Sequence, residues 1–515
     1  MKTYLLGIDN GGTVTKGALY QLDGSEVAVV SQKLPMLTPF PGHTERDSEE
    51  LWQANLTVIR ELLSQTGVSG EDIAALSITG HGNGVYLADK TGKPTYNGVI
   101  STDTRGKDYV AQWLQDGTFK RTLPKTYNSI WAGQPAPILR WLVNNEPEVI
   151  AKTDYVFMCK DYIKYRLTGS PCTEISDFSG GGMLNIAEKR IDRELLAEFG
   201  IEAIYDKLPP LTDPLTVNGY ITAKVAKLTG LKIGTPVAGG TMDMHASAIA
   251  TGSVQKDQLC ITAGTWSINE FFDTKPVVSD DLFMCAIAPE NNYLIAEGSP
   301  TSASNLEWFL SEVLKDIDTK GQNLYDLANQ LVESAPYDAS NLIFLPFLFG
   351  TNVDANAKSA FVGISAWHTR KHLLRAIYEG VVFSHRHHID KLLSQGAGFK
   401  RARIAGGVVN SPIWIQLFAD ILQVPIEVTK TKELGAMGAA IVAGVSVELF
   451  SSIQEATDQM VNVVEIYQPD INKKRIYDTK YHLYRNLIGK LQPIWKAFDT
   501  VSIAQKTDES ESVVL

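Results

Sequence analysis

The segment 4–20 gathers into one predicted turn the residue types that suit phosphate and metal chemistry. It reads YLLGIDNGGTVTKGALY, and the strand-forming runs at 4–8 and 15–20 predict a β-hairpin. Glycines in the turn let backbone N–H groups approach an anion, and a carboxylate at the strand end can hold Mg²⁺. The residues concerned are Asp9 for the metal and Gly12, Thr13 and Lys16 for the phosphates. An ordinary hairpin with a polar turn is the alternative.

A second carboxylate, Asp243, stands where a strand ending in glycines gives way to a predicted helix, in the run Gly240–Ala246. A carboxylate at a helix N-terminus is stabilised by the helix dipole whether or not it takes part in a reaction. These residues alone therefore leave Asp243 as either a chemical group or a helix N-cap.

Two further segments carry side chains that suit sugar hydroxyls. The predicted strand 73–79 runs into a glycine-rich loop with His81 and Gly82, and α/β proteins place ligand contacts at such strand ends. Asp103 and Arg105 follow near the start of a helix. Arginine donates through a planar fork and aspartate accepts, which suits hydroxyl recognition. A helix cap with a surface charge is the alternative for this pair.

The opening pattern recurs in the second half of the chain. The runs 259–263 and 266–272 flank Gly264 and Thr265, which again gives strand, turn and strand. Further on, the strand 401–405 leads into Gly406, Gly407 and Asn410, ahead of a helix that begins with proline. A glycine pair between a strand and a helix N-terminus suits a nucleotide. The repetition predicts two domains that each begin with a β-hairpin, with nucleotide phosphates held between the two turns.

Two other sets of residues invite a metal interpretation that their spacing does not support. The cluster His385–His388 lies on a predicted helix without an acidic or thiol partner at ligand spacing, so exposed histidines are the simpler interpretation. The four cysteines show no ligand spacing, so we expect buried, reduced thiols.

Length and composition indicate an ordinary enzyme-sized protein. A chain of 515 residues is too long for one core, which predicts two large domains. The net charge of −11 argues against a nucleic-acid partner, because phosphate backbones need a basic face. We see no apolar run long enough to cross a bilayer, and the first apolar run stops at Asp9, which argues against a signal peptide. We therefore expect a cytoplasmic protein with no membrane partner. P-loop, Rossmann, H-E-x-x-H and G-x-S-x-G motifs do not occur.

In their order along the chain, these runs resemble the FGGY carbohydrate kinases. The resemblance rests on 9–13, 240–243, 264–265 and 406–410, and on a match at full spacing to the family's second signature at 359–364, 372–373 and 376–379. The first signature is weaker, since 137–142 keeps the proline and tryptophan but has Ile138 in place of the usual lysine. The resemblance covers about residues 4–450.

The resemblance implies an α/β fold of two actin-like (ribonuclease H-like) domains around an interdomain ATP/sugar cleft. The expected domains are 1–247 with the sugar site, 248–450 with the nucleotide site, and 451–515 as a helical extension with a polar tail. Asp243 resembles the catalytic base, and Asp9 and Asp243 the residues near Mg²⁺. The expected ATP contacts are Gly12, Thr13, Lys16, Gly264, Thr265, Gly406, Gly407 and Asn410, and the expected sugar contacts are His81, Gly82, Asp103, Arg105 and Asp243.

The loop 79–84 predicts the substrate. It lacks the Arg-Glu pair with which glycerol kinases grip the triol and resembles the His-Gly loop of xylulose-type kinases, most of all L-xylulose kinases. The position before Asp103 also lacks the usual tryptophan, which enlarges the pocket for a longer substrate. We expect phosphorylation of the terminal hydroxyl of a pentulose, L-xylulose first and D-xylulose next. The alternatives are a polyol kinase for erythritol or glycerol, and an actin-like ATPase or sugar sensor without kinase activity. The sequence leaves the oligomeric state open, with a homodimer as one option.

Overall fold

The computed structural model describes residues 3–319 and 321–511, with side chains to residue 498, and divides into two compact units. Unit 1 consists of 1–255, 271–295 and 430–462, and unit 2 of 256–270, 296–429 and 463–515. These units differ from the expected domains 1–247, 248–450 and 451–515 chiefly because 271–295 and 430–462 belong to unit 1.

Unit 1 is built on a seven-stranded mixed sheet in the order β13-β14-β5-β1-β2-β3, with β15 also paired to β5. The predicted hairpin is confirmed, since β1 and β2 pair antiparallel with Asp9 opposite Lys16. Strands β1 and β5 pair in parallel, so their carboxyl ends meet at one edge of the sheet. The strands are β1 (Tyr4–Asn10), β2 (Val14–Gln21), β3 (Glu26–Lys33), β5 (Ile73–Gly80), β13 (Val217–Tyr220), β14 (Pro236–Ala238) and β15 (Thr241–Met242).

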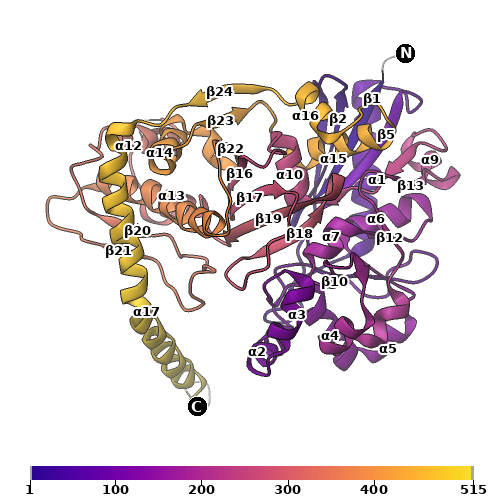
Figure 1. Ribbon diagram of the computed structural model, residues 1–515, viewed down its shortest axis with the longest axis horizontal. Helices are drawn as coiled ribbons and strands as arrows, with labels where there is room; N and C mark the ends of the chain where they lie inside the picture. The colour runs from indigo at the N-terminus through magenta and orange to yellow at the C-terminus, as the bar shows by residue number, and fades with distance from the viewer. Residues whose placement is uncertain (1–2, 320, 512–515) are drawn as a thin grey trace. The chain divides into compact units, whose positions relative to one another are not determined.

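The helices that pack on this sheet come from near and distant parts of the chain, and local sequence explains where α1 begins and ends. In α1, the Asp47 side chain accepts from the N–H groups of Glu49 and Glu50, and Gly67 ends the helix with a φ of 67°. Helix α15 comes from far along the chain yet lies beside β1 (Figure 1), where a Cβ on Gly7 would stand 1.8 Å from a carbonyl oxygen of α15. The helices are α1 (Ser48–Thr66), α6 (Cys159–Thr168), α9 (Ala223–Thr229), α10 (Asp243–Thr251), α15 (Leu434–Ser446) and α16 (Ile453–Met460).

The remainder of unit 1 consists of about residues 84–212 together with β4, which pairs with β7, and it has a core of its own. Leu139, Leu142, Phe178 and Leu195 are among its buried members. Its strands and helices are β4 (Glu45–Arg46), β6 (Tyr86–Ala88), β7 (Gly98–Val99), α2 (Lys107–Gln115), α3 (Thr118–Thr126), α4 (Pro135–Asn145), α5 (Pro147–Lys152), β8 (Tyr155–Phe157), β9 (Thr173–Glu174), α7 (Ile175–Gly180), β10 (Leu184–Asn185), β11 (Arg190–Ile191), α8 (Arg193–Glu198) and β12 (Leu211–Thr212).

The second large sheet has the order β18-β19-β17-β16-β22-β23-β24, and the boundary of unit 2 passes within β17 and β19. The predicted repetition is confirmed: β16 and β17 form an antiparallel hairpin, and β16 pairs in parallel with β22. The strands are β16 (Gln258–Ala263), β17 (Ser267–Asp273), β18 (Met284–Ala288), β19 (Asn292–Ser299), β20 (Ile343–Leu345), β21 (Ala360–Val362), β22 (Arg401–Ala405), β23 (Ile426–Thr429) and β24 (Val463–Tyr467). The helices are α11 (Ser304–Trp308), α12 (Leu324–Glu333), α13 (Arg370–Ser394), α14 (Pro412–Leu422) and α17 (Lys474–Glu511). The α/β class is therefore confirmed.

The structure also tests two expectations from composition. All four cysteines are buried and free, as predicted. None of the helices in the described part of the chain has the length and apolar character that crossing a membrane requires.

Candidate active site

Three strand ends in unit 1 bring the predicted chemical groups to one edge of its sheet. Strand β5 lies between the others in register, with Thr79 paired both to Asp9 and to Thr241. Asp9 is near the end of β1, His81 directly follows β5, and Asp243 directly follows β15. The His81 N–H also donates to the Asn10 carbonyl at 2.9 Å. Parallel pairing thus gathers residues that are far apart in sequence.

Asp243 is a half-buried carboxylate held by a backbone donor. The Met244 N–H donates to its Oδ1 at 2.8 Å, and the backbone of Gly82 acts to lower its pKa. Burial, followed by the nearby charge of Asp9, raises the pKa of Asp243 from 3.8 to about 7. Met242 occupies the N-cap of α10, so Asp243 is the first helical residue and accepts a first-turn N–H from that position. A carboxyl that titrates near neutrality suits a general base.

Asp9 offers an oxygen atom without a protein partner. Its Oδ1 is buried and accepts no hydrogen bond within the described residues. Burial raises its pKa to about 6, with Lys16 opposing and Glu433 adding to the shift. Because Asp9 also raises the pKa of Asp243, the two carboxylates lie within electrostatic range of each other. An orphaned oxygen and a repelling carboxylate pair fit Mg²⁺, which takes one or two carboxylates together with water and phosphates.

The turn after β1 is open, but its predicted cation is already paired. Gly12 and Thr13 are exposed, and a Cβ on Gly12 would meet no atom within 4 Å. The Lys16 ammonium lies 2.7 Å from a Glu433 carboxylate oxygen. The turn therefore presents backbone N–H groups, while the charge of Lys16 is largely offset by Glu433.

His81 is a neutral, buried histidine with one engaged ring nitrogen. Its Nε2 is hydrogen-bonded to the Tyr86 hydroxyl at 2.9 Å. Burial, followed by repulsion from Arg46, lowers the pKa of His81 from 6.5 to about 3. Its Nδ1 is buried without a partner in the part of the chain that the structure describes. An unpaired ring nitrogen at a strand end is available to a ligand oxygen.

Asp103 and Arg105 form a buried ion pair with each other. Arg105 donates from Nε and Nη2 to the two Asp103 oxygens, both at 2.9 Å, and from Nη2 to Glu45 at 2.6 Å. Asp103 also accepts the Thr44 N–H at 2.7 Å, and the guanidinium lies 5.0 Å from the Trp141 ring centroid. These contacts fasten the loop 100–105 to β4. A direct contact of either residue with sugar stays a prediction.

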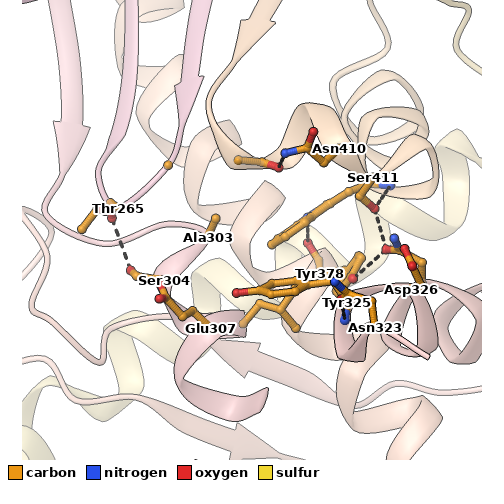
Figure 2. Close-up of a pocket in the computed structure, with 15 residues that line it drawn as sticks. Thr265, Ala303, Ser304, Glu307, Asn323, Tyr325, Asp326, Tyr378, Asn410 and Ser411 are labelled. Atoms are coloured by element: carbon orange, nitrogen blue, oxygen red, sulfur yellow. Dashed lines mark hydrogen bonds between the residues drawn. The ribbon is translucent and has the colours of Figure 1, made fainter. Parts of the chain in front are cut away.

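Unit 2 contains a pocket of about 570 Å³ that includes four of the predicted nucleotide residues, Gly264, Thr265, Gly407 and Asn410 (Figure 2). Gly406, the other nucleotide residue predicted in unit 2, is not among the residues that line this pocket. It has a φ of 93°, and a Cβ there would stand 2.5 Å from the Ala263 carbonyl oxygen, so only glycine lets the two turns lie side by side. Gly264 and Gly407 face open space.

Other pocket residues were missed by sequence reasoning. Tyr378 and Trp414 stack with ring centroids 4.2 Å apart. The side-chain Oδ1 of Asn329 accepts from the Tyr378 hydroxyl at 2.8 Å and from the Ser411 hydroxyl at 2.7 Å. Figure 2 shows Thr265 and Ser304 joined by a hydrogen bond. Tyr378 lies in the recognisable run 376–379, but the others stand in segments without a motif. The remaining lining residues include Glu307, Asn323, Tyr325 and Asp326.

The histidine cluster supports this pocket from inside the protein, and the expectation that it is exposed is wrong. His385 and His388 are fully buried. His385 is hydrogen-bonded to Asn269 at 2.8 Å and to Ser302 at 2.9 Å, while His388 contacts Glu297 at 3.0 Å. Among the described residues, no group of three or more His, Cys, Asp or Glu could hold a metal ion. His385 thus connects β17 to the segment ahead of α11.

Known proteins are similar to this chain over nearly its whole length. The FGGY family of carbohydrate kinases matches through its N-terminal domain at residues 4–250 and its C-terminal domain at 259–447. The L-xylulose/3-keto-L-gulonate kinase of Escherichia coli (strain K12) is 37% identical over 501 residues, which cover 96% of this chain and 98% of that protein.

Solved structures also match nearly the whole chain, at lower sequence identity. The gluconate kinase from Lactobacillus acidophilus has a TM-score of 0.89 at 26% identity, covering 97% of this chain and 100% of that chain. The ligand-bound xylulose kinase from the same organism has a TM-score of 0.89 at 26% identity, covering 96% of this chain and 100% of that chain. The expected two-domain α/β fold is confirmed by this likeness.

Proposed function

We propose, because this chain belongs to the FGGY family of carbohydrate kinases, that it transfers the γ-phosphoryl group of ATP to the terminal primary hydroxyl of a pentulose. L-xylulose is the first candidate and D-xylulose the second. Since ATP is the donor, we place the reaction in the cytoplasm. The E. coli relative is named for L-xylulose and 3-keto-L-gulonate, and one similar structure is named for xylulose.

Phosphoryl transfer needs positioning and charge neutralisation more than covalent help from the protein, and unit 1 supplies both. Asp243 accepts the proton of the attacking hydroxyl, with the Met244 N–H holding its carboxylate in place. Asp9, with its unpartnered Oδ1, and Asp243 would hold Mg²⁺. When bound, that ion would neutralise charge on the phosphates.

The pocket of unit 2 supplies the nucleotide site in this proposal. Gly264 and Gly407 have open space beside their Cα atoms, which lets phosphate oxygens approach the backbone closely. The stacked Tyr378 and Trp414 rings and the Asn329 side chain form a firm wall that suits a flat base. Within unit 1, the exposed turn at Gly12 and Thr13 is a separate place that suits phosphate oxygens.

One observation predicts a substrate oxygen beside His81, which a keto group or a hydroxyl would supply. The Nδ1 atom of His81 is buried and unpartnered among the described residues, and the low pKa of the ring keeps the imidazole neutral. A neutral imidazole can donate to or accept from a hydroxyl, and its N–H form can donate to a keto oxygen. The loop 79–84, which is the predicted sugar loop, therefore has one atom, His81 Nδ1, that lacks an oxygen partner.

ADP release with a panel of free substrates tests the proposal. We expect release to depend on sugar, with the highest kcat/KM for L-xylulose or D-xylulose and lower values for D-gluconate, erythritol and glycerol. ADP release that is equal with and without sugar would indicate an ATPase or sensor. A higher kcat/KM for glycerol or erythritol than for every pentulose would support the polyol kinase instead.

His81→Ala should distinguish ketose from polyol in the same assay. We expect kcat/KM for the pentulose to fall about 10–100-fold, the value of one or two hydrogen bonds to buried polar groups, and erythritol to lose less. Erythritol has no keto oxygen, so it loses no contact at that atom. His368→Ala, in unit 2, removes a histidine hydrogen-bonded to Ser340 and serves as the control. Equal losses for both substrates would contradict the keto-oxygen assignment.

A further inference from the structure

Six arginine and lysine side chains are buried among the described residues: Arg46, Arg105, Lys160, Lys164, Arg375 and Lys480. Five of them contact a carboxylate, at distances of 2.6 to 3.0 Å. Arg46 is the exception, with no carboxylate within ion-pair distance in the described part of the chain and an exposed fraction of 1%. Buried charges are ordinarily paired, because an unpaired one loses its hydration without compensation. The unpaired, buried guanidinium of Arg46 therefore indicates that an anionic ligand binds nearby and compensates its charge.

The contacts of Arg46 direct it at the turn after β1. Its Nη1 donates to the Gly11 carbonyl at 3.0 Å, its Nη2 donates to the Gly12 carbonyl, and its Nε is buried without a partner. The peptides of this turn are trans, as are all those in the described part of the chain, so each peptide whose carbonyl faces Arg46 points its N–H the opposite way. The N–H groups of Gly12 and Thr13 are consequently aimed away from Arg46. Both residues are exposed.

Strand pairing explains how two adjacent charges reach different partners. Glu45 and Arg46 form β4, which pairs antiparallel with β7. Successive side chains of a strand point to opposite faces, so Glu45 meets Arg105 while Arg46 meets the glycine turn. Arg46 also lowers the pKa of His81, which places its charge within electrostatic range of the loop 79–84. Lys16, the cation expected at this turn, is paired with Glu433 instead.

We infer that Arg46 is a positioning residue for the phosphates: it aims the Gly12 and Thr13 N–H groups at them and places an uncompensated positive charge behind that turn. The inference rests on the proposed kinase function. In the absence of nucleotide this arrangement destabilises the fold, because the buried charge is unpaired. With phosphates at the turn the same charge becomes favourable.

Arg46→Gln removes the charge and keeps an amide donor for the carbonyls. We expect ADP to bind about tenfold or more weakly by calorimetry, in keeping with the loss of a charge-assisted contact, while adenosine binds as to wild type. We expect kcat to fall about 10²-fold, as when one preorganised group is lost from a transition-state site, with KM for the pentulose unchanged. The melting temperature without ligand should stay equal or rise, while the increase that ADP gives should shrink.

Arg375→Gln is the matched control. Arg375 is buried and also donates to two backbone carbonyls, those of Val332 and Ala335, but it is paired with Glu379. Its variant should melt at a lower temperature and keep the full ADP effect, which is the reverse of the Arg46 signature. Arg46→Lys restores the charge without the fork, so it should recover ADP affinity more than kcat. This variant also tests the inference if Arg46→Gln does not fold.

Three results would overturn the inference: ADP affinity equal to wild type in folded Arg46→Gln, a kcat equal to wild type in Arg46→Lys, or a loss confined to acid sugars such as D-gluconate. ADP binding requires no sugar turnover, so the affinity result is readable even if the wild-type protein phosphorylates no sugar. Failure of sugar-dependent ADP release would refute the proposed function and leave the nucleotide measurements standing.

Discussion

Asp243→Asn should lower kcat by about 10²–10⁴-fold, the usual contribution of a positioned general base, with ATP and sugar binding retained. The carboxylate accepts the Met244 N–H at 2.8 Å, so the amide oxygen of Asn can take the same place. In the wild type the pKa of about 7 predicts that kcat/KM rises about tenfold per pH unit below that value and levels above it. Initial rates from pH 5.5 to 9 for both proteins test this.

The same substitution should stabilise the protein at high pH. The pKa of Asp243 is raised from 3.8 to about 7, so the folded state holds the proton more tightly than the unfolded state. The contribution of Asp243 to stability is therefore greatest below about pH 4 and falls as pH rises through about 7. Removing the charge should raise the free energy of unfolding at pH 8 by about 1–3 kcal/mol, since one pKa unit corresponds to about 1.4 kcal/mol.

Asp192→Asn separates this behaviour from that of an ordinary buried carboxylate. Asp192 caps α8 through the N–H groups of Glu194 and Leu195, and it pairs with Lys125 at 2.9 Å. Its pKa is lowered to about 2. Asp192→Asn should therefore lose stability above that pKa and keep kcat. Near-normal turnover in folded Asp243→Asn would remove the base assignment.

Local rules account for most of the predicted fold. The two hairpins, the Asp47 cap of α1 and the proline that begins α14 all depend on residues close together in sequence. The return of 430–462 to unit 1 could not be foreseen in this way. The small residues of α15 indicate close packing but do not name the partner, and the lack of space at Gly7 appears only once β1 and α15 are placed together.

The candidate site likewise contains residues that local sequence predicts and contacts that it does not. Asp9, His81 and Asp243 could be predicted because each follows a recognisable strand. The pairing of Lys16 with Glu433 and the role of Arg46 depend on contacts between residues far apart in sequence, and the dipeptide Glu45-Arg46 carries no motif. The burial of His385 could not be predicted from the sequence either, because its partners Asn269 and Ser302 are distant along the chain.

Asp9→Ala should raise the Mg²⁺ concentration needed for half-maximal rate by about tenfold or more and lower kcat, with KM for the pentulose little changed. The physical reason is the loss of the buried, unpartnered Oδ1. Because the Asp9 charge contributes to the raised pKa of Asp243, the acidic limb of the rate profile should also move below pH 7. Asp89→Ala removes a turn carboxylate that accepts the Thr91 and Lys93 N–H groups, and it should leave both measurements unchanged. A Mg²⁺ titration of Asp9→Ala that overlays the wild type would make Asp9 a turn residue only, whereas a displaced titration and pH limb together would show that one carboxylate serves both the metal and the base.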